Sequence, residues 1–333
     1  AVSYHLKAIR LDPGNSDYYA ELANVFANQG NSERAISCYQ IAICLNPVNS
    51  AYYDSFGIFQ MRIKEYNLAY NIFKKINSKF SNKKTLECLY GLNEFQKLKD
   101  TIDDLARSDG TDREVAAFAT YASYQAQFPN TFRFCPNPLD FVEIINVERY
   151  TDDPCALIKT LTGELSKSSR VWEPRSQTLR HGAQSVNNIF DSRINGIDEL
   201  QNILAGAIKD YFKRFKNDEC LFVQNHPLDY SLVGWSVDLY KNGHHVNHMH
   251  AQGWLSGVFY LSTIQSNDEQ GNIEFGLDGY SFEPRRPGGP SKQHSPRNGD
   301  LVLFPSSLFH RTIPFREDTI RKTIAFDVVP REK

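Results

Sequence analysis

Apolar and small residues recur with a period of 34 positions over the first hundred residues. Pro13 and Pro47 mark this period. Large side chains are expected where two antiparallel helices touch, and small ones where their backbones approach. The matched positions are Tyr19 with Tyr53, Leu22 with Phe56, Ala23 with Gly57, Ala35 with Ala69, and Tyr39 with Phe73. The pattern therefore predicts helix pairs that stack on one another.

The 34-residue period resembles that of tetratricopeptide repeats, which form a superhelix. Shifted back by one period, Ala1 and Ala8 fall on Ala35 and Ala42, so the chain begins in the second helix of a repeat. A repeat without its first helix exposes an apolar face, and we therefore expect further repeats upstream.

The period weakens before the middle of the chain. Apolar residues spaced three and four apart still predict helices over 85–105 and 113–125, as a degenerate repeat and a capping helix. Residues 128–138 are rich in proline and turn-forming residues, which favours a linker. We therefore predict a helical repeat domain over 1–127 and a second domain over 139–333.

The second domain begins with mixed elements and continues as β-structure. Alternating apolar positions predict a strand over 141–147, and helical spacing predicts helices over 154–168 and 197–215. From Leu232 onward β-type alternation dominates, with predicted strands over 235–240, 254–261, 301–310 and 321–327. The predicted fold class is α + β, with an all-α repeat solenoid followed by a β domain that has flanking helices.

Two segments of this domain are predicted to be irregular. His244 and His245 lie beside Gly243 in an expected turn, where exposure to solvent is the simplest interpretation. Residues 278–296 contain Gly288, Gly289 and several prolines, so a long loop is expected there. Long loops in compact domains are typically functional lids or disordered segments.

Composition narrows the classes of function. The 333 residues carry a formal net charge of −2 and no run of basic residues, so nothing favours binding of nucleic acid. No apolar stretch approaches the length of a membrane span, and no signal peptide is visible. The six cysteines are scattered, which favours buried free thiols in a reduced, cytoplasmic protein.

Four of the nine histidines fall within seven residues, at positions 244, 245, 248 and 250. In an extended chain, His248 and His250 point to the same face and can aim at one point. Imidazole is the commonest metal ligand, and a predicted strand ends at a further histidine, His310. The sequence thus predicts a metal centre in a β domain. A solvated loop that binds stray metal is the simpler alternative.

Several motifs in this region resemble the 2-oxoglutarate- and iron(II)-dependent oxygenases. In that family a His-x-carboxylate pair precedes a distant histidine and then an Arg-x-Ser/Thr motif. The closer resemblance is to a bacterial and phage branch often found behind tetratricopeptide repeats, and it covers roughly residues 138–333. The matching residues are Gly182-x-Gln184-Ser185, Trp235-Ser236, Asn247-His248-Met249-His250, Gly253-Trp254-Leu255-Ser256, Phe304-Pro305-Ser306 before His310, Thr312-x-Pro314-Phe315, Arg321-x-Thr323, and Ala325-Phe326-Asp327-Val328-Val329-Pro330.

This resemblance implies a double-stranded β-helix, or jelly roll, that binds Fe(II). His248 matches the first iron ligand and His310 the distal one, whereas His250 stands where the family has Asp or Glu. Three neutral imidazoles leave a formal site charge of about +2, instead of about +1 for two histidines and a carboxylate. A chelating 2-oxoglutarate dianion would neutralise the charge of about +2 that three imidazoles leave on the metal. A site that uses only His248 and His310 is the alternative.

The resemblance also implies a binding site for the cosubstrate. Arg321 is the candidate for the C5 carboxylate of 2-oxoglutarate, because a guanidinium grips a carboxylate bidentately. Thr323 lies on the same strand face and could add a hydrogen bond, and Tyr260 matches a tyrosine that often contacts the cosubstrate. A structural ion pair for Arg321 and simple packing for Tyr260 are the alternatives.

Further residues are candidates for the surroundings of the metal. Asn247 and Ser256 could orient the histidines, a role that ligating imidazoles generally require. Gln184 could face the active site or only fix a loop, and His245 could line the pocket. Trp235 and Trp254 are expected to form walls of the barrel.

Together these features predict a dioxygenase that uses Fe(II), 2-oxoglutarate and dioxygen to hydroxylate a C–H bond. No catalytic residue beyond the metal centre is expected. The repeats suggest a peptide or protein substrate, by analogy with other repeat proteins. Two alternatives stay open: an oxygenase for a small metabolite, which a narrow closed pocket would favour, and a non-catalytic repeat-based binding protein whose metal site has lapsed.

Overall fold

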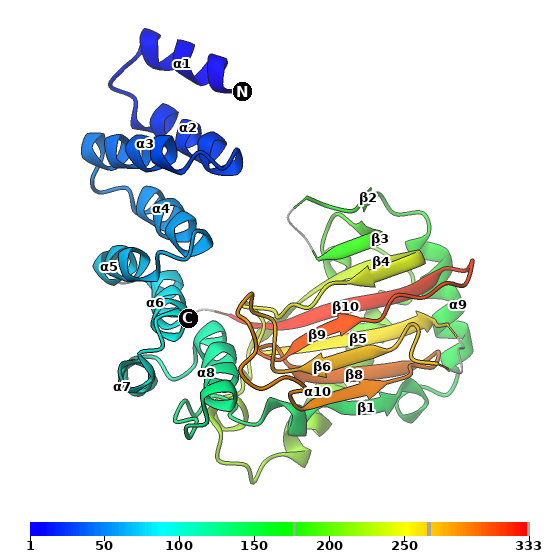
Figure 1. The fold of residues 1–333 in the computed structure, drawn as a ribbon. Helices are drawn as coiled ribbons and strands as arrows, with labels where there is room; N and C mark the ends of the chain where they lie inside the picture. The colour runs from blue at the N-terminus through cyan, green and yellow to red at the C-terminus, as the bar shows by residue number, and fades with distance from the viewer. Residues whose placement is uncertain (77, 176–177, 265–267, 332–333) are drawn as a thin grey trace. The chain divides into compact units, whose positions relative to one another are not determined.

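The computed structural model describes residues 1–76, 78–175, 178–264 and 268–331 (Figure 1). Its contacts divide the chain into two compact units, Ala1–Leu105 and Ala106–Lys333. The first unit is helical, and the second is built mainly from two antiparallel sheets. The predicted fold class is therefore confirmed.

The helices of the first unit follow one another through short turns. Asn15, Asn31 and Asn49 cap three of them, because each side chain accepts a hydrogen bond from a backbone N–H of the first helical turn. Among the described residues, no helix combines the length and apolarity needed to cross a membrane. The helices are α1 (Val2–Leu11), α2 (Ser16–Asn28), α3 (Ser32–Leu45), α4 (Ser50–Arg62), α5 (Tyr66–Ile76), α6 (Lys79–Gly91) and α7 (Phe95–Ser108), the last of which continues past Leu105.

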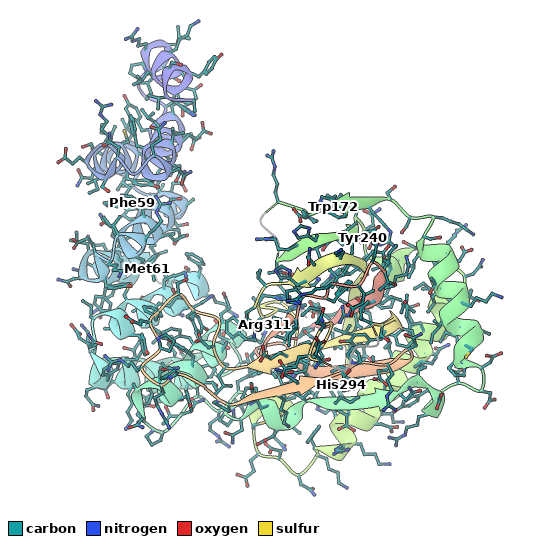
Figure 2. All side chains as sticks on the ribbon, turned by 45° about the vertical axis from the view of Figure 1, so that its right-hand side comes forward. Phe59, Met61, Trp172, Tyr240, His294 and Arg311 are labelled. Carbon is teal, nitrogen blue, oxygen red and sulfur yellow. The ribbon has the colours of Figure 1, made fainter. Side chains whose placement is uncertain are left out.

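Small residues lie where these helices approach one another, as the 34-residue pattern predicts. Ala23 is fully buried, and a Cβ atom added to Gly57 would lie 2.5 Å from the ring of Phe73. Large residues fill the adjoining positions: the ring of Tyr39 stacks on that of Phe56 at 5.3 Å, and Phe59 packs beside them (Figure 2). The region predicted to be helical over 85–105 is helical but not continuous, because α6 ends at Gly91 and α7 begins at Phe95.

The second unit contains one large and one small antiparallel sheet. The order is β1-β8-β5-β10-β4-β3-β2 in the large sheet and β7-β6-β9 in the small one. At one edge of the large sheet, Trp172 of β2 packs on Tyr240 of β4 (Figure 2). The strands are β1 (Glu143–Asn146), β2 (Arg170–Trp172), β3 (Leu179–Ser185), β4 (Tyr230–His245), β5 (Leu255–Ser262), β6 (Ile273–Gly276), β7 (Ser291–His294), β8 (Asp300–Pro305), β9 (Phe309–Thr312) and β10 (Arg321–Pro330).

An apolar core joins the two sheets. Tyr260 of β5 and Phe304 of β8 pack in one buried cluster with Phe275 of β6. Helices pack against the large sheet (Figure 1), where α9 contacts β5. The helices of this unit are α8 (Arg113–Ala126), α9 (Pro154–Leu165), α10 (Ile197–Arg214) and α11 (Leu221–Gln224), with short 3₁₀ turns η1 (Pro138–Phe141), η2 (Val147–Arg149) and η3 (Ile189–Asp191).

Three predicted segments differ from the observed strands. The expected strand over 301–310 is two strands, β8 and β9, which belong to different sheets. Ser306 and Ser307 turn the chain between them while staying buried, so the run looks continuous in the sequence. The turn expected around Gly243 is also wrong, because β4 continues to His245. The predicted loop over 278–296 contains β7.

Helix α8, which was expected to cap the repeats, packs within the second unit. The ring of Phe118 meets that of Tyr280 edge-to-face at 4.9 Å. The side chain of Gln125 accepts a hydrogen bond from the backbone N–H of Arg286 at 2.8 Å and donates one to its carbonyl oxygen at 3.3 Å. The domain boundaries at 127 and 139 therefore stay a prediction, while these contacts group α8 with the β-sheets.

Candidate metal centre

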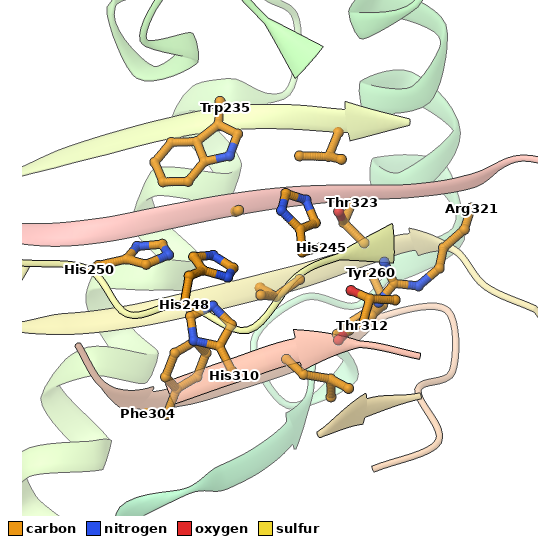
Figure 3. Close-up of a pocket in the computed structure, with 15 residues that line it drawn as sticks. Trp235, His245, His248, His250, Tyr260, Phe304, His310, Thr312, Arg321 and Thr323 are labelled. Carbon is orange, nitrogen blue, oxygen red and sulfur yellow. The ribbon is translucent and has the colours of Figure 1, made fainter. Parts of the chain in front are cut away.

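Three imidazoles meet where the segment between β4 and β5 approaches β9 (Figure 3). His248 and His310 form an isolated antiparallel bridge, with backbone N–H···O distances of 3.0 and 2.9 Å. The backbone N–H of His250 donates to the carbonyl oxygen of Ser306 at 2.9 Å. One nitrogen from each of the three rings lies within 4.8 Å of the others. The structure thus brings together the three histidines that the sequence singled out.

Hydrogen bonds occupy the Nδ1 atom of each of the three rings. Nδ1 of His248 and Nδ1 of His310 each lie near the carbonyl oxygen two residues earlier, at 2.8 and 3.2 Å. Nδ1 of His250 lies 2.7 and 2.9 Å from the two carboxylate oxygens of Asp327. In the tautomer that donates from Nδ1, each Nε2 keeps a lone pair for a cation. The donor set is therefore three Nε2 atoms.

The electrostatics of the cluster differ from ring to ring. Burial lowers the pKa of His248 to about 4, and the nearby charge of His250 adds to this effect. Burial, followed by the charges of His248 and His250, holds the pKa of His310 well below its ordinary value. For His250 burial also acts downward, but Asp327 outweighs it and the pKa is raised. Neutral imidazoles are the form that binds a metal.

A pocket runs from the histidines into the space between the sheets (Figure 3). Arg321 lies at its inner end, with its guanidinium carbon 5.0 Å from the ring centre of Tyr260. Thr323 lines the same pocket, one position along the inward face of β10. The three residues predicted to bind a cosubstrate are thus gathered in one place.

Arg321 is a buried cation with no carboxylate partner in the part of the chain that the structure describes. Its side chain is 3% exposed, and neither its Nε atom nor the hydroxyl of Tyr260 has a hydrogen-bond partner. Among the described residues, no carboxylate lies within ion-pair distance of it, so the alternative of a structural ion pair has no support. Burial lowers the pKa of Arg321 and raises that of Tyr260 to about 12. An arginine still stays charged, which suits an anionic ligand.

The other predicted residues occupy several different places. Ser256 is buried, and its hydroxyl donates to Asp327 at 2.6 Å, one hydrogen bond away from His250. His245 and Gln184 line an open hollow of about 340 Å³ beside His248 and His250. Asn247 lies in a separate cavity, where its side chain donates to the carbonyl oxygen of Asp278.

Four residues that the sequence placed only in motifs or in the barrel wall turn out to contact the site. Asp327 holds His250, and Thr312 lines the inner pocket. Trp235 stacks on His250 with ring centres 5.7 Å apart, and Phe304 lies 4.6 Å from His310. The motifs alone assign no role to Asp327, Thr312 or Phe304, whereas Trp235 does form a wall of the pocket, as predicted. The alternation of β10 could have found Asp327, because it shares its face with Arg321.

The donor set and the pocket fit one particular pair of ligands. Three nitrogen donors on one side of a point leave other positions open, and imidazole suits divalent iron, nickel and zinc. At the opposite end, the Nε atom of Arg321 and the hydroxyl of Tyr260 lack a geometric hydrogen-bond partner and could hold a carboxylate. A small dicarboxylate that reaches from the metal to Arg321 matches both ends.

Comparisons with known proteins give the following matches. Residues 234–327 match a family model described as "Putative 2OG-Fe(II) oxygenase", and residues 6–37 match one for a tetratricopeptide repeat. No curated protein matches the sequence.

Solved structures of low sequence identity resemble each part of the chain. A prolyl-4-hydroxylase from Pseudomonas putida is 15% identical with a TM-score of 0.41, covering 60% of this chain and 96% of its own. HygX from Streptomyces hygroscopicus, solved with nickel and 2-oxoglutarate bound, is 16% identical with a TM-score of 0.37, covering 57% and 82%. MamA from Desulfovibrio magneticus RS-1 is 14% identical with a TM-score of 0.33, covering 38% and 74%.

Proposed function

We propose that this chain, which carries a 2-oxoglutarate- and iron(II)-dependent oxygenase domain and a tetratricopeptide repeat, hydroxylates a peptide or protein that the repeats recruit. An oxygenase of this type uses Fe(II), 2-oxoglutarate and dioxygen. The observation that carries the proposal is the pocket with three clustered imidazoles at one end and the buried Arg321, which has no carboxylate partner among the described residues, at the other.

Each end of the pocket has its own part in the proposed reaction. His248, His250 and His310 would hold Fe(II), which together with 2-oxoglutarate and dioxygen supplies the oxidising power for C–H hydroxylation. Arg321, with Thr323 and Tyr260 beside it, would bind the distal carboxylate of 2-oxoglutarate. A two-point attachment of this kind fixes the orientation of the cosubstrate, which lowers the entropic barrier to reaction.

The apolar walls have a second task in this proposal. Phe304 and Phe275 are buried beside His310, and the indole of Trp235 lies against His250. Such walls exclude water from the reacting centre and prevent side reactions.

The substrate would enter through the open hollow beside His248 and His250. Gln184 lines this hollow, and its buried Oε1 atom has no hydrogen-bond partner. A peptide N–H could satisfy that acceptor, and His245 lies on the same side. A hollow of about 340 Å³ that opens to solvent favours a chain-like substrate over a fully enclosed metabolite.

The first experiment is an anaerobic titration with Fe(II) and 2-oxoglutarate. We expect a weak visible metal-to-ligand charge-transfer band, and then succinate formation once dioxygen is admitted. If neither appears, the chain is instead a non-catalytic binding protein with a lapsed site.

A second experiment identifies the class of substrate. An extract of the source cells is split into protein and small-molecule fractions, and each is incubated with the loaded enzyme under ¹⁸O₂. We expect ¹⁸O to enter a peptide of the protein fraction. Label found only in the small-molecule fraction would establish the metabolite alternative.

The six free cysteines support the further proposal of a reducing, cytoplasmic location.

A further inference from the structure

A buried carboxylate lies directly behind one of the three histidines. Asp327 of β10 is 8% exposed, and its oxygens lie 2.7 and 2.9 Å from Nδ1 of His250. The ring therefore donates its Nδ1–H to the carboxylate and keeps Nε2 for the point shared with His248 and His310. Such a partner fixes both the tautomer and the direction of a ligating ring.

The other two rings lack a charged partner of this kind. His248 and His310 donate from Nδ1 to backbone carbonyl oxygens, at 2.8 and 3.2 Å. A carbonyl also fixes a ring, but it carries a dipole instead of a full charge. Within the trio, the negative charge therefore stands behind His250 alone.

The surroundings of Asp327 hold its carboxylate in place. The hydroxyl of Ser256 donates to Oδ1 at 2.6 Å, and the hydroxyl of Ser306 lies 2.8 Å from that of Ser256. A Cβ atom at Gly253 would lie 3.1 Å from the carboxyl carbon of Asp327. The absence of a side chain at Gly253 therefore lets the backbone approach the carboxylate closely.

His250 is the sole cationic partner of this carboxylate within the described part of the chain. Over residues 1–76, 78–175, 178–264 and 268–331, no lysine or arginine lies within 4.0 Å of it, and its one ion-pair partner is His250. When His250 is neutral, as it is when it binds a metal, this ion pair is lost, and a buried carboxylate without a counter-charge costs several kcal/mol in effective terms. A cation on the far side of the His250 ring would balance it.

We infer that Asp327 is a positioning residue that restores, through His250, the negative charge that a carboxylate ligand would otherwise supply. The inference rests on the proposed Fe(II) site. Three neutral imidazoles leave a divalent ion with a charge of about +2, whereas two imidazoles and a carboxylate leave about +1. With Asp327 counted behind His250, the site returns to about +1. The metal then has three nitrogen ligands and the net charge of a facial triad with one carboxylate.

The test compares the wild-type protein with Asp327→Asn, which keeps the shape of the side chain and removes its charge. Co(II) serves as the probe, because its visible spectrum reports its ligands, and the affinity is measured by titration without dioxygen. We expect Asp327→Asn to bind Co(II) about 10- to 100-fold more weakly. We also expect its spectrum to shift, and the charge-transfer band with Fe(II) and 2-oxoglutarate to move with it.

Asp300→Asn is the matched control. Asp300 is a second buried carboxylate that accepts a hydrogen bond from a histidine, with 2.9 Å between its Oδ2 and Nε2 of His294, and it lies outside the cluster. We expect this variant to bind Co(II) like the wild type. Equal losses in both variants would mean general destabilisation and would refute the inference.

Two further outcomes separate the inference from the proposed function. If the wild type forms the complex with Fe(II) and 2-oxoglutarate but Asp327→Asn binds Co(II) just as tightly, only the inference fails. If the wild type forms no such complex, the proposed function fails and the inference with it. Should Asp327→Asn not fold, Ser256→Ala retains the carboxylate but loses its hydroxyl donor, and we expect a smaller loss of Co(II) affinity in the same direction. Unchanged affinity in that variant would count against the inference.

Discussion

Arg321 is a charged side chain that the fold buries without giving it an internal anion. Its guanidinium faces the histidines across the pocket, beside the hydroxyl of Tyr260. We predict that Arg321→Gln weakens binding of 2-oxoglutarate by about 10- to 100-fold, because a charge-assisted hydrogen bond contributes about 1.5–3 kcal/mol. Titration of the charge-transfer band measures this change. Affinity for Co(II) alone should stay unchanged.

Lys322→Gln is the control for this prediction. Lys322 is the next residue of the same strand, points to the opposite face, and bonds Asp238 at 3.1 Å. The variant removes the same unit of positive charge. A similar loss of 2-oxoglutarate affinity would mean that the net electrostatic potential of the domain, and not a contact inside the pocket, sets the affinity.

The residues of the site were predictable where their types and spacing matched the motifs of the family that the sequence resembles. The two-residue spacing of His248 and His250, and the later positions of His310 and Arg321, were enough to find both ends of the pocket. Asp327 escaped notice because an acidic residue in a strand is normally interpreted as facing solvent. Only the contact between β10 and the segment that joins β4 to β5 reveals that this carboxylate faces a histidine.

At the scale of elements, Asp300 holds the turn that begins β8. Burial acts to raise its pKa, but hydrogen bonds from His294, the backbone of Arg297 and Asn146 outweigh burial and lower it (His294 is labelled in Figure 2). A lowered folded-state pKa means that the unfolded chain binds the proton more readily. The stabilisation is therefore present above the ordinary value of about 4 and is lost as the pH falls through the folded-state pKa.

We accordingly predict that Asp300→Asn lowers the free energy of unfolding by about 1–3 kcal/mol at pH 7, because it leaves buried donors poorly paired. The difference from the wild type should shrink as the pH falls through the lowered folded-state pKa of Asp300, because the wild-type carboxylate is then itself protonated. Urea unfolding at a series of decreasing pH values measures it. A difference that stays constant with pH would rule out the charge of Asp300 as its source.

In the repeats, α4 and α5 pack closely where Gly57 faces the ring of Phe73. Gly57→Ala should stabilise an isolated helix by about 1 kcal/mol, yet its new methyl group would meet the buried ring of Phe73. We predict net destabilisation by about 1–3 kcal/mol, as is usual for overpacking. Thermal unfolding followed by circular dichroism measures this change.

The control is Gly14→Ala in the turn before α2, where the added Cβ would meet its nearest neighbour at 3.6 Å, an ordinary contact. That variant should unfold close to the wild type. Equal unfolding of Gly57→Ala and the wild type would show that Phe73 can move aside.

Element boundaries were harder to predict than element types. The repeat period located the helix pairs, because the contacts of each pair are close in sequence. The run from Leu301 to His310 gave no sign of its break, since the serines that turn the chain are as buried as the apolar residues around them. Where α8 packs depends on distant partners such as Tyr280, which helical periodicity does not report.

For the whole molecule, the packing of α8 sets where the chain can be cut. A chain of residues 109–333 retains α8 with its partners Tyr280 and Arg286. We predict that it folds, binds Fe(II) with 2-oxoglutarate, and forms succinate slowly without substrate. Its hydroxylation of a protein substrate should fall strongly, because the proposed recruiting repeats are missing.

A chain of residues 139–333 is the contrasting variant. It lacks α8, so the ring of Tyr280 and the segment around Arg286 lose their contacts, and we expect a lower thermal midpoint than for 109–333. Similar midpoints would favour the boundary predicted from the turn-rich segment. If the chain of residues 109–333 hydroxylates a protein substrate as well as the full chain does, the repeats do not recruit the substrate.

The backbone bridge between His248 and His310 has a practical consequence. Because two hydrogen bonds of the main chain already join these residues, little ordering of the chain remains to be done when an ion arrives. We therefore expect that a chelator can remove a bound ion without disordering the site, and that nickel or zinc can replace it. Loaded with such a redox-inert ion, the protein would bind its substrate without converting it, and the bound substrate could then be isolated and identified.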